Sequence, residues 1–320
     1  MTATESASVG KQLVRIGLLA AVAANAWSDD YSYEVGFGFE RAETSLLDTN
    51  FATIGPGPGF PSLSVDTETT AFEISGTWFF DGLSDARGPR SRAAFVDRAS
   101  SLTLVIGDSS SDTDSVFRIP GGTPPEIRDS FESDGTSFAV GGRYVSEPSG
   151  WFFTGEIARI DLDTFGSSAE VDLLAAGVGK YLGETTTLEL SVARSEIDIS
   201  GGGDDSDSGL ILEFDHIGGD ASGLQYGLGA SVSNQSIEGS SGSYSVRGSL
   251  YPNRDLSLNL IVSGQLGSDP IDATVFSVTG GWFFTESFEV SAGYTFTEFD
   301  EEENVDLDDD GFRLSARYRF

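Results

Sequence analysis

The chain of 320 residues carries 51 Asp and Glu against 18 Lys and Arg, which gives a formal net charge of −33 at pH 7, and it contains no Cys. Nucleic-acid binders need a basic surface, so this charge excludes nucleic acid as a partner. The absence of Cys excludes disulfide frameworks, thiolate metal sites and cysteine nucleophiles. At 38% hydrophobic and 11% aromatic residues, the chain is too apolar to be an acidic disordered polypeptide.

The N-terminus contains the parts of a secretory signal peptide in the expected order. Lys11 and Arg15 precede an apolar run at residues 16–24, and small residues follow it. The run is shorter than the roughly 20 residues that a membrane-spanning helix needs. The pattern predicts a signal peptide at residues 1–26 and a mature domain at residues 27–320. A buried or amphipathic N-terminal helix is the alternative.

Alternation of apolar with small or polar residues recurs along the rest of the chain and predicts strands. The first such segment carries its apolar side chains on one face, at Tyr31, Tyr33, Val35, Phe37 and Phe39. The others are centred on residues 72–80, 102–106, 138–144, 151–160, 171–181, 188–192, 210–214, 224–233, 244–250, 256–262, 276–284, 288–296 and 312–320. We predict about fourteen strands. Twelve or sixteen remain open, because two long connections, residues 42–68 and 108–134, are too polar and Pro-rich to be assigned as strands.

Three features favour a membrane barrel over a soluble sandwich, whose strands also alternate. Short connections alternate with longer polar ones, and all ten Pro fall in connections, where no ladder donor is needed. Aromatic residues mark strand ends, as at a membrane interface, at Trp78, Tyr144, Tyr181, Tyr251, Trp282 and Tyr318. Because strands in a bilayer must pair all their backbone groups, the sequence predicts an all-β, antiparallel up-and-down transmembrane β-barrel.

The last segment carries a family resemblance. Residues 311–320, GFRLSARYRF, alternate up to a terminal aromatic residue. Paired with a signal peptide, such a strand resembles the C-terminus of the outer-membrane porin-type β-barrels of Gram-negative bacteria. The resemblance implies localisation in the outer membrane of a Gram-negative bacterium, contact with its lipid and lipopolysaccharide, and insertion by the barrel-assembly machinery that reads the terminal strand. It leaves the oligomeric state open.

One connection is longer than the short turn expected at its position. Residues 81–100 contain a group of basic residues, Arg87, Arg90, Arg92 and Arg98. The GP, AAF and RAS elements of this segment resemble a segment of porins from marine and aquatic Gram-negative bacteria. The sequence assigns no strand to it.

The predicted inward face is rich in Ser, Thr, Gly and charged residues, and lacks the Leu, Ile and Phe that fill a dry barrel. A barrel of about fourteen strands with this lining is expected to hold water. The predicted function is a porin-like channel for passive diffusion of ions and small hydrophilic solutes. One alternative is a non-conducting outer-membrane barrel whose surface loops serve adhesion or structure. Another is a soluble, secreted β-sandwich.

Inward charges form the candidate site. Three arginines of the last strand are expected to neighbour carboxylates of the adjoining strands. The predicted channel-lining residues are Glu34, Glu40, Arg143, Arg247, Glu289, Arg313, Arg317 and Arg319. Facing acidic and basic rows create a transverse field that orients solutes and sets ion preference. The alternative is a set of wall salt bridges that only neutralise one another. Lys180 is also assigned to the inward face.

Other charges are assigned to the loop side. Residues 204–208 and 300–310 form acidic clusters in the predicted wide loops. They suggest divalent-cation binding or a mouth that attracts cations, against a merely solvated acidic surface. Arg159 and Arg194 are expected to face outward, where they either touch lipopolysaccharide phosphates or snorkel.

The sequence predicts no enzyme, no metal site and no cofactor. His216 is the only histidine and shares the outward parity of Phe214. No nucleophile and base occur at a spacing that singles them out. The segment that starts at Asp306 is similar to a calcium loop in its alternating Asp residues, but its twelfth position is Arg317, where that motif needs Glu.

Overall fold

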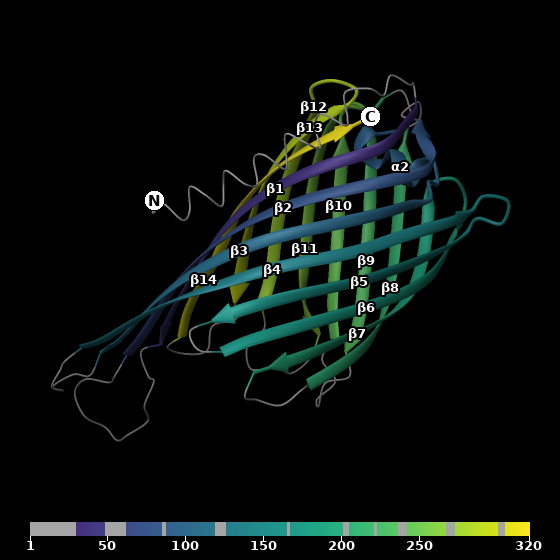
Figure 1. The fold of residues 1–320 in the computed structure, drawn as a ribbon. Helices are drawn as coiled ribbons and strands as arrows, with labels where there is room; N and C mark the ends of the chain where they lie inside the picture. The colour runs from purple at the N-terminus through teal and green to yellow at the C-terminus, as the bar shows by residue number, and fades with distance from the viewer. Residues whose placement is uncertain are drawn as a thin grey trace.

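The computed structural model describes residues 30–48, 62–84, 88–118, 126–164, 167–200, 205–220, 223–235, 242–266, 273–299 and 305–320. Within these ranges, fourteen antiparallel strands form one closed barrel in which each strand pairs with its neighbours in the chain and β1 pairs with β14 (Figure 1). The predicted all-β barrel of fourteen strands is confirmed. The predicted signal peptide at residues 1–26 lies outside the described residues.

The first eight strands are β1 (Asp30–Asp48), β2 (Ser62–Ser84), β3 (Ser101–Arg118), β4 (Glu126–Ser146), β5 (Trp151–Thr164), β6 (Ser167–Tyr181), β7 (Thr186–Ile199) and β8 (Asp205–Gly219). The other six are β9 (Gln225–Gln235), β10 (Gly242–Tyr251), β11 (Leu256–Leu266), β12 (Ala273–Phe283), β13 (Phe288–Phe299) and β14 (Val305–Arg319). Between β2 and β3 lie a 3-10 helix, η1 (Arg90–Arg92), and one turn of α-helix, α2 (Ala93–Val96). Across the described part of the chain, no helix has the length and apolar character needed to cross a membrane.

The wall of the barrel has two different faces. Large apolar side chains such as Phe138, Leu190 and Leu260 are about half exposed on the outside. Their chain neighbours Ser137 and Ser191 point into the barrel. Because a soluble protein rarely exposes a continuous apolar surface, this outer face requires an apolar solvent, which for a closed barrel is a lipid bilayer.

The strands differ in length around the barrel. β1 to β4 contain 18 to 23 residues, whereas β9 to β12 contain 10 or 11. A tilted strand of about 9–11 residues is enough to cross a bilayer. The long strands therefore continue past the bilayer, away from the end that carries the C-terminus and α2 (Figure 1). We call the C-terminal end, which has the connections at 147–150, 182–185, 252–255 and 284–287, the short-turn end.

The prediction that residues 42–68 and 108–134 are loops is wrong for most of their length. β1 continues to Asp48, β2 starts at Ser62, β3 continues to Arg118 and β4 starts at Glu126. Paired hydroxyls support this extension: Thr67 Oγ1 lies 3.0 Å from Thr113 Oγ1, and Thr69 Oγ1 lies 2.7 Å from Ser111 Oγ. Outside the bilayer neither face has to be apolar, so these strands lack the alternation by which strands are recognised.

The acidic clusters predicted in the wide loops belong in part to strands, since β8 starts at Asp205 and β14 at Val305. Direct cross-strand partners on β14 and β1 to β4 form one outward row of carboxylates: Asp310, Glu43, Glu68, Asp112 and Glu132. Arg41 Nη2 lies within 3.1 Å of Glu43 and 2.9 Å of Glu68. Directly opposed like charges destabilise a sheet, so this row needs water and counter-ions, and it marks the edge of the apolar belt.

The aromatic residues at the short-turn end divide between the two faces. Those exposed on the outside, as predicted for a girdle, are Trp78, Tyr144, Trp282 and Tyr318. The same prediction is wrong for Tyr181 and Tyr251, which are only 5% and 2% exposed and lie inside the barrel. Tyr31 is also buried, because a register shift between Tyr31 and Tyr33 reverses its direction.

Arginine substitutions at neighbouring positions of β11 test the two faces. Leu260 lies on the apolar outer face, and Asn259 lies beside it on the inner face. An arginine facing lipid at the bilayer midplane costs about 2–4 kcal/mol, whereas a lumen arginine remains hydrated. We expect Leu260→Arg to lower the free energy of unfolding in lipid vesicles by about this amount and Asn259→Arg to leave it nearly unchanged, as measured by urea titration. Equal losses for the two variants would contradict the assignment of the faces.

Candidate functional site in the barrel lumen

The closing seam of the barrel brings the predicted charges together. β14 pairs with β1 on one side and with β13 on the other. The register sets three inward arginines of β14 directly opposite carboxylates, in the pairs Arg319–Glu34, Arg317–Glu289 and Arg313–Glu40. Strand parity therefore places these six charges in one vertical row inside the barrel.

The part of this row nearest the short-turn end is a closed ion-pair network. Arg319 Nε lies 2.7 Å from Glu34 Oε2, and Arg317 Nη1 lies 3.4 Å from Glu34 Oε1. Arg317 Nε lies 3.4 Å from Glu289 Oε2. The Arg319 side chain is 3% exposed, whereas that of Arg317 is 40% exposed. Arg319 is thus a buried structural contact, and Arg317 is the member of the network that still faces the lumen.

The part of the row farther from the short-turn end is exposed to solvent. The Arg313 side chain is 56% exposed, and its Nη2 lies 3.7 Å from Glu73 Oε2 of β2. A cavity of about 250 Å³ lies beside it and is also lined by Glu40, Glu73, Ser109 and Ser137. Arg313 and Glu73 are therefore both exposed beside this cavity, with only a weak contact between them.

A second charge pair lies on the wall further round the barrel. Arg247 of β10 and Asp215 of β8 meet across β9, with Nη2 2.8 Å from Oδ2. A glycine stands between them on β9, because a Cβ on Gly229 would lie 3.0 Å from the Arg247 guanidinium. Asp215 is also bound by Arg92, which comes from the connection between β2 and β3.

Arg143 has a different environment from the other predicted lining residues. Its guanidinium carbon lies 3.9 Å from the centre of the Phe152 ring and 5.4 Å from that of Tyr181. Both rings are buried. Its Nε and Nη2 are buried and have no hydrogen-bond partner among the described residues. Contact of a cation with ring faces contributes about 0.5–2 kcal/mol, which in this position fixes the guanidinium against the wall.

Sequence reasoning missed the role of the connection between β2 and β3. Residues 88–100, which we call the mouth insertion, lie inside the short-turn end of the barrel. Tyr181 Oη donates a hydrogen bond to the Phe95 carbonyl at 3.0 Å, and Arg92 reaches Asp215. Ala93 and Phe95 are buried. The excess of arginines in this segment was the one sequence signal of its placement.

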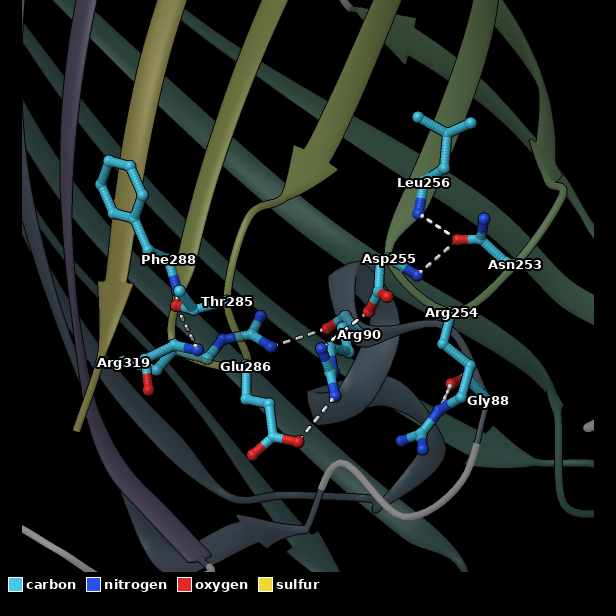
Figure 2. A network of polar contacts seen from close by, with 11 residues as sticks. Gly88, Arg90, Asn253, Arg254, Asp255, Leu256, Thr285, Glu286, Phe288 and Arg319 are labelled. Atoms are coloured by element: carbon cyan, nitrogen blue, oxygen red, sulfur yellow. Dashed lines mark hydrogen bonds and ion pairs between the residues drawn. The ribbon is translucent and has the colours of Figure 1, made fainter.

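Arg90 is the centre of a network at the rim of the barrel (Figure 2). Its Nη1 lies 2.7 Å from Asp255 in the turn between β10 and β11. Its Nη2 lies 3.3 Å from Glu286 in the turn between β12 and β13. Its carbonyl accepts a hydrogen bond of 2.7 Å from Arg319 Nη1. The network therefore joins the mouth insertion to the closing seam.

Lys180 and Arg159 both lie on the outer face of the barrel. Lys180 faces outward, contrary to the prediction, because it is the register partner of Trp151 and its Nζ lies 5.1 Å from that ring. Arg159 faces outward as expected, but its Nε and Nη2 bind Asp172 at 2.7 and 2.8 Å. The charge of Arg159 is thus compensated within the wall, which leaves it poorly suited to bind phosphates.

No group of three or more His, Cys, Asp or Glu in the described ranges is arranged to hold a metal ion. His216 Nδ1 lies 2.8 Å from the hydroxyl of Thr186 at the short-turn end.

No protein-family model matches the chain, and no curated protein matches its sequence. Among solved structures, it is similar to a deltaS2S3 mutant of the TodX monoaromatic hydrocarbon channel (TM-score 0.59, 10% identity, 90% of each chain). It is also similar to the Pseudomonas putida toluene transporter TodX (TM-score 0.53, 9% identity, 92% of this chain and 90% of that chain). The Acinetobacter baumannii outer membrane protein Omp33 matches at 17% identity over 92% of this chain and 100% of its own, with a TM-score of 0.49. The likeness to the TodX structures confirms a porin-type barrel fold.

A glycine under the Arg143 stack provides a test of the inner wall. A Cβ on Gly179 would lie 2.2 Å from Cζ of Phe152, whereas a Cβ on Gly248 meets no atom within 4 Å. Overpacking typically costs about 1–3 kcal/mol. We expect Gly179→Ala to lower the free energy of unfolding by about this amount and the control Gly248→Ala to have little effect, as read from urea midpoints in detergent micelles. If both midpoints move equally, the ring stack does not stabilise the wall.

Proposed function

We propose that the protein is a porin-like channel in the outer membrane of a Gram-negative bacterium, and that it allows passive diffusion of ions and small hydrophilic solutes. The observation that supports this proposal is the lining of the closed barrel. Beyond the aromatic residues at the short-turn end, the inner face carries many Gly, Ser, Thr and ionised side chains, among them the exposed Arg313 beside its cavity. Such a lining holds water, and water-filled barrels of this kind conduct.

The charged lining also favours hydrophilic solutes over apolar ones. The printed names of the TodX structures describe monoaromatic hydrocarbon and toluene transport. Arg313, Glu40 and Glu73 offer hydrogen bonds and charge that an ion or polar solute uses and a hydrocarbon does not. Nearer the short-turn end, the inner wall also carries Arg143, Arg247, Arg317 and Glu34. We assign no catalytic step and no cofactor to the protein.

The proposed partners follow from this location. The outer belt contacts outer-membrane lipid, and the acidic row beyond it faces the headgroups of lipopolysaccharide, whose phosphates approach carboxylates only with cations between them. The last strand, Val305–Arg319, is the segment proposed to engage the barrel-assembly machinery. Nucleic acid has no place in this function. Association into oligomers is not required by it.

Arg313 offers a direct test of a charged, conducting lumen. Arg313→Gln removes an exposed inward cation next to Glu73. Two unit charges about 4 Å apart in water interact with about 1 kcal/mol, so the K⁺ over Cl⁻ permeability ratio should rise by up to about fivefold. The measurement is the reversal potential of single channels in a planar bilayer under a KCl gradient.

Arg159→Gln is the matched control, since it removes the same charge from the outer face. It should leave the reversal potential unchanged. An unchanged reversal potential for Arg313→Gln in a conducting barrel would leave this residue only a role in the wall.

Export through the inner membrane requires a cleaved leader in this proposal. We expect the protein isolated from outer membranes to begin at Trp27, because residues 1–26 carry the features of a signal peptide. Intact-mass spectrometry of the purified barrel measures this end. A mass that retains Met1 would contradict the assignment of residues 1–26 as a signal peptide.

A further inference from the structure

The mouth insertion, residues 88–100, contacts the wall on many sides of the barrel. At its C-terminal end Ser100 Oγ accepts a hydrogen bond of 3.0 Å from Val145 N of β4. Arg98 Nη2 donates to the Gly183 carbonyl, in the turn between β6 and β7, at 2.6 Å. The insertion also contacts β6, β8 and β14, the turn before β11 and the turn after β12. Its partners are therefore spread around the barrel. A segment with such partners crosses the mouth and cannot lie along one wall.

The N-terminal half of the insertion fits closely against the wall. Gly88 and Pro89 are buried. Gly88 has a φ of +70°, and a Cβ there would lie 3.2 Å from Val96 and 3.9 Å from the amide nitrogen of Gln225 on β9. Arg90 N donates to the Arg254 carbonyl at 3.0 Å. The backbone of the insertion is thus packed against the rim beside β9.

Polar contacts, more than apolar packing, hold the insertion in place. Its helices span only Arg90–Arg92 and Ala93–Val96, too short to be stable alone. Its buried apolar side chains are few, chiefly those of Ala93, Phe95 and Ala99. By contrast, the ion pairs of Arg90 and Arg92 place guanidinium groups that are 12% and 21% exposed against carboxylates of the wall. Breaking partly buried pairs of this kind leaves charges unpaired, so they act as clamps.

We propose that the mouth insertion is a plug that sets the permeability of the barrel. Docked as in this structure, it obstructs the short-turn mouth, and Arg90 and Arg92 hold it there. Solutes pass at full rate only when it leaves the mouth. This inference rests on the proposed function, since a plug matters only in a channel.

The first experiment weakens or removes the plug. The variant that combines Arg90→Gln with Arg92→Gln, which we call the clamp variant, loses the contacts to Asp255, Glu286 and Asp215. We expect a several-fold rise in single-channel conductance or in open probability in planar bilayers. The control combines Arg128→Gln with Arg159→Gln, which removes the same charge from exposed positions outside the lumen.

A deletion variant makes the test stronger. Phe80 N donates to the Ser100 carbonyl at 3.0 Å, so a two-residue Asn-Gly turn can replace residues 81–99 between them. This variant should conduct more than the clamp variant and admit larger polyethylene glycols. Heat-dependent migration on a detergent gel shows whether it is folded.

The second experiment holds the plug in place without relying on the deletion. The chain contains no Cys, so Arg90→Cys with Arg254→Cys introduces the only two thiols. A short, reducible bis-methanethiosulfonate reagent bridges them. We expect the bridged barrel to be closed and dithiothreitol to restore a conductance at least as high as that of the unmodified protein.

The outcomes separate the two proposals. Conductance that rises in the clamp variant, falls on bridging and returns on reduction supports the plug. Conductance that is equal in the unmodified, clamp and bridged proteins overturns the plug but leaves the channel. A folded deletion variant that carries no current overturns the channel, and with it the plug.

Discussion

The structure depends on the need to pair every backbone donor and acceptor of a wall surrounded by lipid. Strands satisfy that need only if the first pairs with the last. The seam between β1 and β14 joins residues nearly the whole chain apart, from Glu34 with Arg319 to Asp48 with Val305. With β1 held as it is, a slip of β14 by one residue would turn Leu314 into the lumen and Arg317 into lipid. Closure and side-chain direction are therefore one constraint, and the ion pairs at the seam favour the observed register.

Period-two alternation made much of the fold predictable. It gave the strand count and the direction of the three arginines of β14, because a strand in lipid has one apolar face along its whole crossing. The errors occurred where that rule ends. The prediction placed Lys180 inside the barrel and Tyr181 outside, the reverse of the structure, because an aromatic residue at a strand end was interpreted as a girdle residue. The prediction that Tyr31 lies on the outer apolar face is wrong for another reason, a register shift that the pattern of a single strand does not reveal.

Two parts of the molecule could not be predicted from alternation. The extensions of β1 to β4 are hydrated on both faces, so pairs such as Thr67–Thr113 are formed by residues that resemble loop residues in sequence. The mouth insertion depends on contacts remote in sequence, for example between Arg92 and Asp215. A segment with two very short helices has no periodic signal of its own. Its excess of arginine, in a strongly acidic chain, is the one feature from which carboxylate partners could have been predicted.

Charge is distributed unevenly between the two ends of the barrel. The end with the long strands presents carboxylates in direct opposition, with few basic partners, namely Arg41, Arg118 and Arg128 in the described strands β1 to β4. At the short-turn end, Arg90, Arg92 and Arg319 pair with carboxylates from other strands and turns. Partly buried ion pairs add little net stability over apolar contacts, but they require specific partners. Apolar packing is non-directional and would not by itself specify one docked position of the insertion. Ion pairs with the wall instead give it one defined docked position while keeping the polar lumen that a channel needs.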